Sequence, residues 1–231
     1  MTSRRDELAA GLDRVRGRID RACREVGRVP EEVTLVVVTK FFPASDVRLL
    51  AQLGVTDVGE NRHQEAEAKA RECADLDLSW HFIGGLQSNK AAAVAAYADV
   101  VESVDRPKLL GPLARGAGER ELRVLLQVSL DPPGAVHRAG VDPAGLSTLA
   151  AAVGDHPRLE LAGLMAVAPL GEDPADAFAR LAQVRHAFLT DHPSATVLSA
   201  GMSGDLEQAV AHGATHVRVG SAILGPRPVI L

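Results

Sequence analysis

Residues 33–54 read VTLVVVTKFFPASDVRLLAQLG. The apolar run 33–40 is typical of a buried strand, and the segment 43–54 that follows has the apolar spacing of a short helix ending at Gly54. This stretch therefore predicts one β/α unit, and the rest of the chain repeats the same alternation.

Seven further segments predict strands, at 57–60, 80–85, 99–104, 122–130, 159–167, 196–201 and 216–220. Helical patterns are interleaved with them at 61–74, 87–97, 106–117, 143–154, 174–190 and 203–212. Strict alternation implies a parallel sheet, and eight units favour closure into a (β/α)8 barrel of the TIM type. An open, doubly wound sheet is the alternative. The loops 131–143 and 169–174 follow the fifth and sixth strands, at the end of a barrel where active sites are built.

An additional helix is predicted in the N-terminal segment 1–30, where Ser3 and Asp6 resemble a capping box. Its apolar stripe should pack on the barrel, although it could also mediate dimerisation. The stripe comprises Leu8, Leu12, Val15, Ile19, Ala22 and Val26. The 231 residues are expected to form one domain, since barrels of this type often reach that length.

The composition limits the classes of partner. Apolar residues make up 46% of the chain and aromatic residues 3%, enough for a large aliphatic core. The net charge is −5 and no basic block occurs, so a nucleic-acid partner is not expected. The N-terminus lacks the apolar region of a secretory signal and no stretch reaches membrane-spanning length, so we expect a cytoplasmic protein without a membrane partner. Cys23 and Cys73 are expected to be reduced, structural thiols.

Lys40 ends the first strand and shares its parity with Val36 and Val38. In a barrel that face can be the interior, where partial desolvation favours the neutral amine and makes the lysine competent to form an imine. The alternative is an ordinary lysine at the end of a strand.

Two candidate phosphate cradles follow the last two strands. Gly201, Ser203 and Gly204 come after the seventh strand, and Gly220 and Ser221 after the eighth. Small residues at the start of a helix let backbone N–H groups converge on an anion, and barrels often bind phosphate with these two loops. Simple helix capping by the two serines is the alternative.

Arg218 and His81 are polar residues within predicted strands. Arg218 lies opposite the valines of its strand, so it needs a partner, either a carboxylate such as Glu60 or Asp57 or a ring nitrogen or anion of a ligand. His81 is expected to be a hydrogen-bonded core or rim histidine. No nucleophile–histidine–acid arrangement, metal-ligand spacing, Walker loop or G-x-G-x-x-G motif occurs.

Several motifs, in this order, resemble the pyridoxal phosphate homeostasis protein family: VTKFFPASDV, DVGENRHQEA, WHFIGGLQSNK, ESVDRPKL, GLMAVAP and 198–225. The resemblance covers nearly the whole chain. It implies a barrel similar to the N-terminal domain of alanine racemase that binds pyridoxal 5′-phosphate (PLP) as a monomer. It further implies Lys40 as the Schiff-base lysine and Asn61 beside the ring. It places Ser203, Gly220 and Ser221 around the phosphate, Arg218 at the pyridine nitrogen, and Ser199 and Met202 along that side. The chain departs from the commonest family pattern at Arg62, Gly85, Ala200 and Arg138.

Arginine at the pyridine nitrogen disfavours ring protonation and weakens the cofactor as an electron sink. The only tyrosine, Tyr97, is expected away from the mouth, and the chain ends at Leu231 just after the last barrel unit, so no second base is evident. We therefore expect a protein that binds PLP, buffers it or delivers it to PLP-dependent apoenzymes, without appreciable turnover. Two alternatives are a PLP-dependent amino acid racemase with Lys90, His81 or a partner subunit supplying the second base, and a cofactor-free Schiff-base aldolase or isomerase acting on a sugar phosphate.

Overall fold

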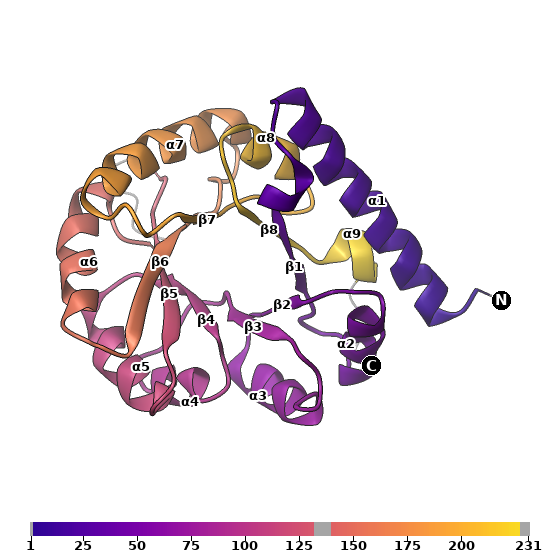
Figure 1. The fold of residues 1–231 in the computed structure, drawn as a ribbon, viewed down its shortest axis with the longest axis horizontal. Helices are drawn as coiled ribbons and strands as arrows, with labels where there is room; N and C mark the ends of the chain where they lie inside the picture. The colour runs from indigo at the N-terminus through magenta and orange to yellow at the C-terminus, as the bar shows by residue number, and fades with distance from the viewer. Residues whose placement is uncertain (1, 132–139, 227–231) are drawn as a thin grey trace.

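Eight parallel strands close into a barrel in the computed structural model, which describes residues 2–131 and 140–226 (Figure 1). Closure is made by β1 and β8, which pair from Thr34 with His216 to Val37 with Val219. This pairing confirms the (β/α)8 barrel and excludes the open sheet. The strands are β1 (Thr34–Val38), β2 (Asp57–Glu60), β3 (Ser79–Phe82), β4 (Val100–Val104), β5 (Leu122–Gln127), β6 (Leu159–Met165), β7 (Val197–Ser199) and β8 (His216–Val219).

The helices surround the barrel in an outer ring (Figure 1). They are α1 (Arg4–Glu25), α2 (Ala44–Gln52), α3 (His63–Glu72), α4 (Ala91–Ala95), α5 (Leu110–Ala117), α6 (Leu146–Gly154), α7 (Pro174–Asp191), α8 (Leu206–Ala211) and α9 (Ser221–Leu224). Short 3₁₀ turns lie at Pro30–Glu32, Pro107–Leu109 and Pro143–Gly145. No helix within the described ranges is long and apolar enough to span a membrane.

The elements differ from the predicted ranges mainly at their ends. Most predicted strands ran one to three residues too far at the carboxyl end, because those residues leave the ladder to form the mouth of the barrel. Two predicted helices, 106–117 and 143–154, begin with a 3₁₀ turn. Helix α9 begins at Ser221, where a helix start was expected after the last strand although no range was predicted for it. The predicted loop 131–143 lies largely outside the described residues.

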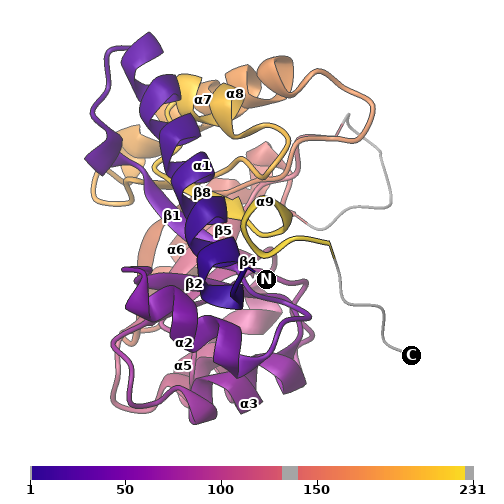
Figure 2. The same cartoon turned by 90° about the vertical axis from the view of Figure 1, so that its right-hand side faces the viewer.

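Helix α1 covers the outside of the barrel beside β1 and β8 (Figure 2). The capping box at Ser3 and Asp6 is present, as predicted. Five residues of the predicted stripe are buried against the barrel, whereas Val26 is 42% exposed. The stripe is therefore used within the chain, and the monomeric state stays a prediction. Both cysteines are buried and unpaired, and burial raises the pKa of each thiol, which agrees with structural roles.

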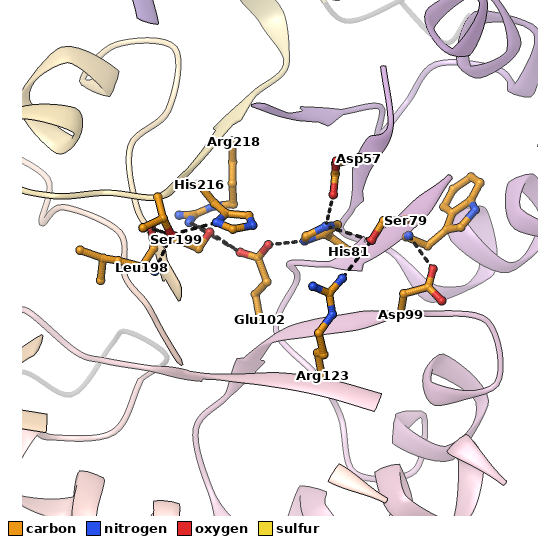
Figure 3. A network of polar contacts seen from close by, with 12 residues as sticks. Asp57, Ser79, His81, Asp99, Glu102, Arg123, Leu198, Ser199, His216 and Arg218 are labelled. Atoms are coloured by element: carbon orange, nitrogen blue, oxygen red, sulfur yellow. Dashed lines mark hydrogen bonds and ion pairs between the residues drawn. The ribbon is translucent and has the colours of Figure 1, made fainter. Parts of the chain in front are cut away.

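The strand parity predicted for β8 is confirmed. Val217 and Val219 pack outward in the apolar cluster that contains α1. His216 and Arg218 point into the barrel, where polar side chains from several strands meet (Figure 3).

Candidate functional site

A cavity of about 410 Å³ lies at the carboxyl ends of β1 and β8. Six of the eight predicted site residues line it: Lys40, Met202, Ser203, Arg218, Gly220 and Ser221. Gly204, which was predicted as part of the first phosphate cradle, also lines it. The other lining residues were not predicted: Val38, Phe41, Phe42, Ile83 and Gly225. Phe41 and Phe42 follow Lys40 directly, so their position after β1 is the signal by which they could have been found.

Lys40 lies in the turn that follows β1, and hydrogen bonds from neighbouring elements fix the backbone of this turn. Thr39 donates from its N–H to the carbonyl of Gly59 at 3.0 Å, and Lys69 donates from Nζ to the Thr39 carbonyl at 2.7 Å. The next residue, Phe41, has a left-handed backbone with φ of 73°, which is strained for a bulky side chain. Its N–H donates to the carboxylate of Glu65. The turn is therefore fixed at the point where Lys40 enters the cavity.

The loop at Ser203 after β7 and the loop at Ser221 after β8, here called the serine loops, form a wall of the same cavity that is rich in hydrogen-bond donors. The hydroxyls of Ser203 and Ser221 lie 3.4 Å apart. Within the described part of the chain, the N–H groups of Ser203, Gly204 and Ser221 have no acceptor. A Cβ on Gly220 would lie 3.0 Å from the carbonyl oxygen of Val38, so the glycine lets the two strand ends approach. Such a set of unpaired donors can hold an anion of the size of phosphate.

Arg218 is 4% exposed and forms the floor of the cavity. It donates from Nη1 to Ser199 Oγ at 2.7 Å and from Nη2 to the Ala166 carbonyl at 2.9 Å. Among the described residues its Nε–H has no acceptor. Burial lowers the pKa of Arg218 from its usual value, but a guanidinium stays protonated in proteins. The guanidinium has five N–H groups, so this fixed cation keeps donors for a ligand, with Nε–H among them.

The carboxylate partner of Arg218 is Glu102 on β4, at 3.7 Å, and not Glu60 or Asp57 as expected. Glu60 instead accepts from Lys69 at 2.7 Å. Asp57 is engaged further down the barrel. The correction has a simple physical reason, because closure of the sheet brings β4 across the interior from β8.

A chain of polar contacts continues from Arg218 through the barrel (Figure 3). Ser199 Oγ donates to Glu102 Oε2 at 2.6 Å, and the other oxygen of Glu102 is 2.8 Å from His81 Nδ1. His81 Nε2 in turn is 3.0 Å from Asp57 Oδ1. His81 is therefore a buried, hydrogen-bonded core residue, as predicted.

The pKa values of two histidines in the barrel interior, His81 and His216, are shifted in opposite directions. Burial alone would lower the pKa of His81, but the hydrogen bonds and charges of Asp57 and Glu102 outweigh it and raise the pKa to about 9. Burial would raise the pKa of Glu102, yet His81, Arg218 and Ser199 lower it to about 2. His216 is 6.2 Å from His81 between ring centroids, and burial together with that charge lowers its pKa to about 4.

These shifts predict that stability is greatest near roughly pH 6.5. His81 has a raised pKa in the folded state, so its contribution is complete below the unfolded value and is lost as pH rises through about 9. His216 has a lowered pKa, so its contribution is present above the unfolded value and is lost as pH falls through about 4. Each change corresponds to about 3 kcal/mol. Urea unfolding between about pH 4 and pH 10 measures both limbs.

The variant His81→Gln is the control for that measurement. It should flatten the alkaline limb. The acidic limb should become smaller without disappearing, because burial still lowers the pKa of His216 when the charge of His81 is gone. A wild-type stability that stays constant from neutral pH to above about pH 9 would contradict the assignment.

Two predicted site residues do not line the cavity. Ser199 lies beneath Arg218 and accepts a hydrogen bond from it. Asn61 packs against the backbone of Gly84, where a Cβ would lie 2.6 Å from Asn61 Oδ1. Both remain neighbours of lining residues, so their contact with a ligand stays a prediction.

The departures from the family pattern fall at different places. The Arg62 guanidinium lies over the ring of Phe41 at 5.1 Å. Gly85 is exposed with no atom near the position of a Cβ, and Ala200 is buried. Arg138 lies outside the described residues.

Comparisons with known proteins agree with the barrel fold. The family model of the alanine racemase N-terminal domain matches residues 12–228. A relative from Mycobacterium tuberculosis, named pyridoxal phosphate homeostasis protein, is 44% identical and aligns over 97% of this chain and 94% of its own. The structure of PipY from Synechococcus elongatus with PLP bound is 38% identical, with a TM-score of 0.81 over 94% of this chain and all of PipY. An unknown protein from Bifidobacterium adolescentis reaches a TM-score of 0.86 at 33% identity, over 95% of both chains.

Proposed function

This chain belongs to the pyridoxal phosphate homeostasis protein family. From this premise we propose that it binds PLP in the cavity at the carboxyl ends of β1 and β8 and holds it by a Schiff base to Lys40. We further propose that it stores the cofactor or delivers it to PLP-dependent apoenzymes rather than turning substrates over. Its role is then to keep intracellular vitamin B6 in balance.

One observation carries this proposal: a single cavity brings together the three kinds of group that PLP requires. An amine is supplied by Lys40. Hydroxyl and N–H donors for a phosphate are supplied at Ser203 and Ser221, beside Gly220. A donor for the ring nitrogen is supplied by Arg218. The fit to PLP therefore rests on complementary chemistry at both ends of the cofactor.

Arg218 also supports a role without turnover. PLP supplies an electron sink, whose strength depends on protonation of its ring nitrogen. A guanidinium cannot accept a proton from that nitrogen or give one up at neutral pH, so it keeps the nitrogen unprotonated. Ser199 and Glu102 fix the guanidinium in this position.

The cavity also lacks an obvious second base. Among its described lining residues, only Lys40 and Arg218 have titratable side chains. His81 is held between two carboxylates inside the barrel, and Tyr97 stacks on His63 outside the cavity. The alternative of a PLP-dependent amino acid racemase needs such a base, so we favour storage and delivery.

One sample tests the proposal. The purified protein is titrated with PLP, and the loaded protein is then incubated with L-alanine in deuterated buffer. We expect a visible absorption band that saturates at one PLP per chain and no enzymatic deuterium exchange at Cα.

An alanine racemase loaded with PLP serves as the positive control for exchange. Exchange by this protein at the rate of that control would contradict the storage role. The absence of any band on titration would contradict PLP binding itself.

A further inference from the structure

Helix α1 lies against the two segments that carry the proposed phosphate donors. It packs on α8, which follows β7, and on α9, which follows β8 (Figures 1 and 2). Helix α1 therefore supports the serine loops from behind through α8 and α9. It also reaches the cavity wall at Phe42, where the Arg4 guanidinium lies 5.5 Å from the centre of the ring.

Arg18 is the first direct link between α1 and these loops. Its guanidinium donates to both carboxylate oxygens of Glu207, at 2.6 and 2.8 Å, and from Nη1 to the carbonyl of Ser203 at 2.9 Å. That carbonyl belongs to the same planar peptide group as the N–H of Gly204, and in a trans peptide the two point in opposite directions. Arg18 holds the Ser203 carbonyl toward α1. The Gly204 N–H of the same peptide group must therefore point away from α1.

Gly11 is the second link. A Cβ at this position would lie 2.6 Å from the Ile223 carbonyl oxygen and 2.8 Å from its Cα, so only glycine lets α9 approach this closely. A helix with glycine in its interior is less stable than one with alanine at the same position. The packing of α9 against Gly11 has to compensate for this loss of stability. Helix α9 begins at Ser221, two residues before Ile223.

Arg4 fastens the end of the same short helix. Its Nη2 donates to the carbonyl of Leu224 at 3.1 Å and to Asp46 at 2.6 Å. Helix α9 is therefore held by α1 at Ile223 and at Leu224. A shift of α1 relative to the barrel would move Ser221 as well.

We propose that α1 is a positioning element for the phosphate group of the ligand, with Arg18 orienting the loop at Ser203 and Gly11 seating α9. The inference rests on the proposed function, because it takes PLP as the occupant of the cavity. It assigns to α1 the preference for phosphorylated over unphosphorylated forms of the cofactor.

Two matched pairs of variants in α1 test this inference. Arg18→Ala is compared with Arg16→Ala, whose guanidinium contacts the carbonyls of Leu53 and Gly54 instead. Gly11→Ala is compared with Gly17→Ala, where the nearest atom to a Cβ is an arginine nitrogen at 3.7 Å. Each variant is titrated with PLP and with pyridoxal, which lacks the phosphate, and its thermal unfolding is recorded without ligand.

We expect Arg18→Ala and Gly11→Ala to weaken PLP binding about tenfold, the loss of one charge-assisted contact, while pyridoxal binding stays within about twofold of the wild type. The two control variants should bind both ligands as the wild type does. If Gly11→Ala does not fold, the arginine pair decides.

Equal losses for both ligands would overturn the positioning role, since they would indicate a general disturbance of the fold. Unchanged PLP binding in Arg18→Ala would overturn it too. Failure of the wild type to bind PLP would instead contradict the proposed function, so the two failures are distinguishable.

Discussion

Replacing Lys40 by alanine should abolish the visible absorption band that PLP produces with the wild-type protein. The band requires an imine, and Lys40 is the one lysine among the described residues that line the cavity. Loss of a covalent contact should weaken PLP binding at least about a hundredfold, which is about 3 kcal/mol. Absorption titration measures the band, and equilibrium dialysis measures the residual binding through the phosphate donors.

Lys108→Ala is the matched control, because Lys108 is an exposed lysine on the 3₁₀ turn that precedes α5. It should retain the band at full intensity. The assignment of Lys40 is wrong if Lys40→Ala forms the same band with the same affinity.

Replacing Glu102 by alanine should destabilise the protein by about 3–5 kcal/mol, the range found when one partner of a buried ion pair is removed. Glu102 is fully buried and lies 2.8 Å from His81 and 3.7 Å from Arg218. Without it, the positive charges of His81 and Arg218 face each other inside the barrel. Urea unfolding at neutral pH measures the loss.

Glu160→Ala is the control for that measurement, since Glu160 is an exposed glutamate on β6. It should change stability by less than about 0.5 kcal/mol. Glu102→Gln keeps the shape of the side chain without the charge and should fall between the two. A change in Glu102→Ala no larger than that of Glu160→Ala would contradict the role of the buried pair.

Much of the barrel could be predicted from local patterns. Each β/α unit carries its own signal, as the run 33–40 and the helix before Gly54 show. The alternation of apolar and polar residues in β8 correctly predicted that Arg218 points into the barrel (Figure 3). Lys40, Ser203 and Ser221 could be singled out because they follow strands at the same end of a parallel barrel, where their loops must meet.

The contacts across the barrel could not be predicted in the same way. Glu102 lies within DVVESV, and nothing in that segment indicates that closure brings it opposite β8. Glu60 and Asp57 were expected as partners of Arg218 because of their charge and their position in a strand. The sequence does not show which strands face each other across the closed barrel. Gly11 also gives little signal, since a glycine in a helix indicates a close approach only when the neighbouring element is known.

The most direct test of the account is the site at which PLP is attached. The PLP-loaded wild type is reduced with borohydride, digested and mapped by mass spectrometry, with the loaded Lys40→Ala variant treated in parallel. We predict one modified peptide, carrying the reduced cofactor on Lys40, and none at stoichiometric level in the variant. A reduced cofactor found on another lysine, or no modified peptide from a protein that has bound PLP, would contradict the account.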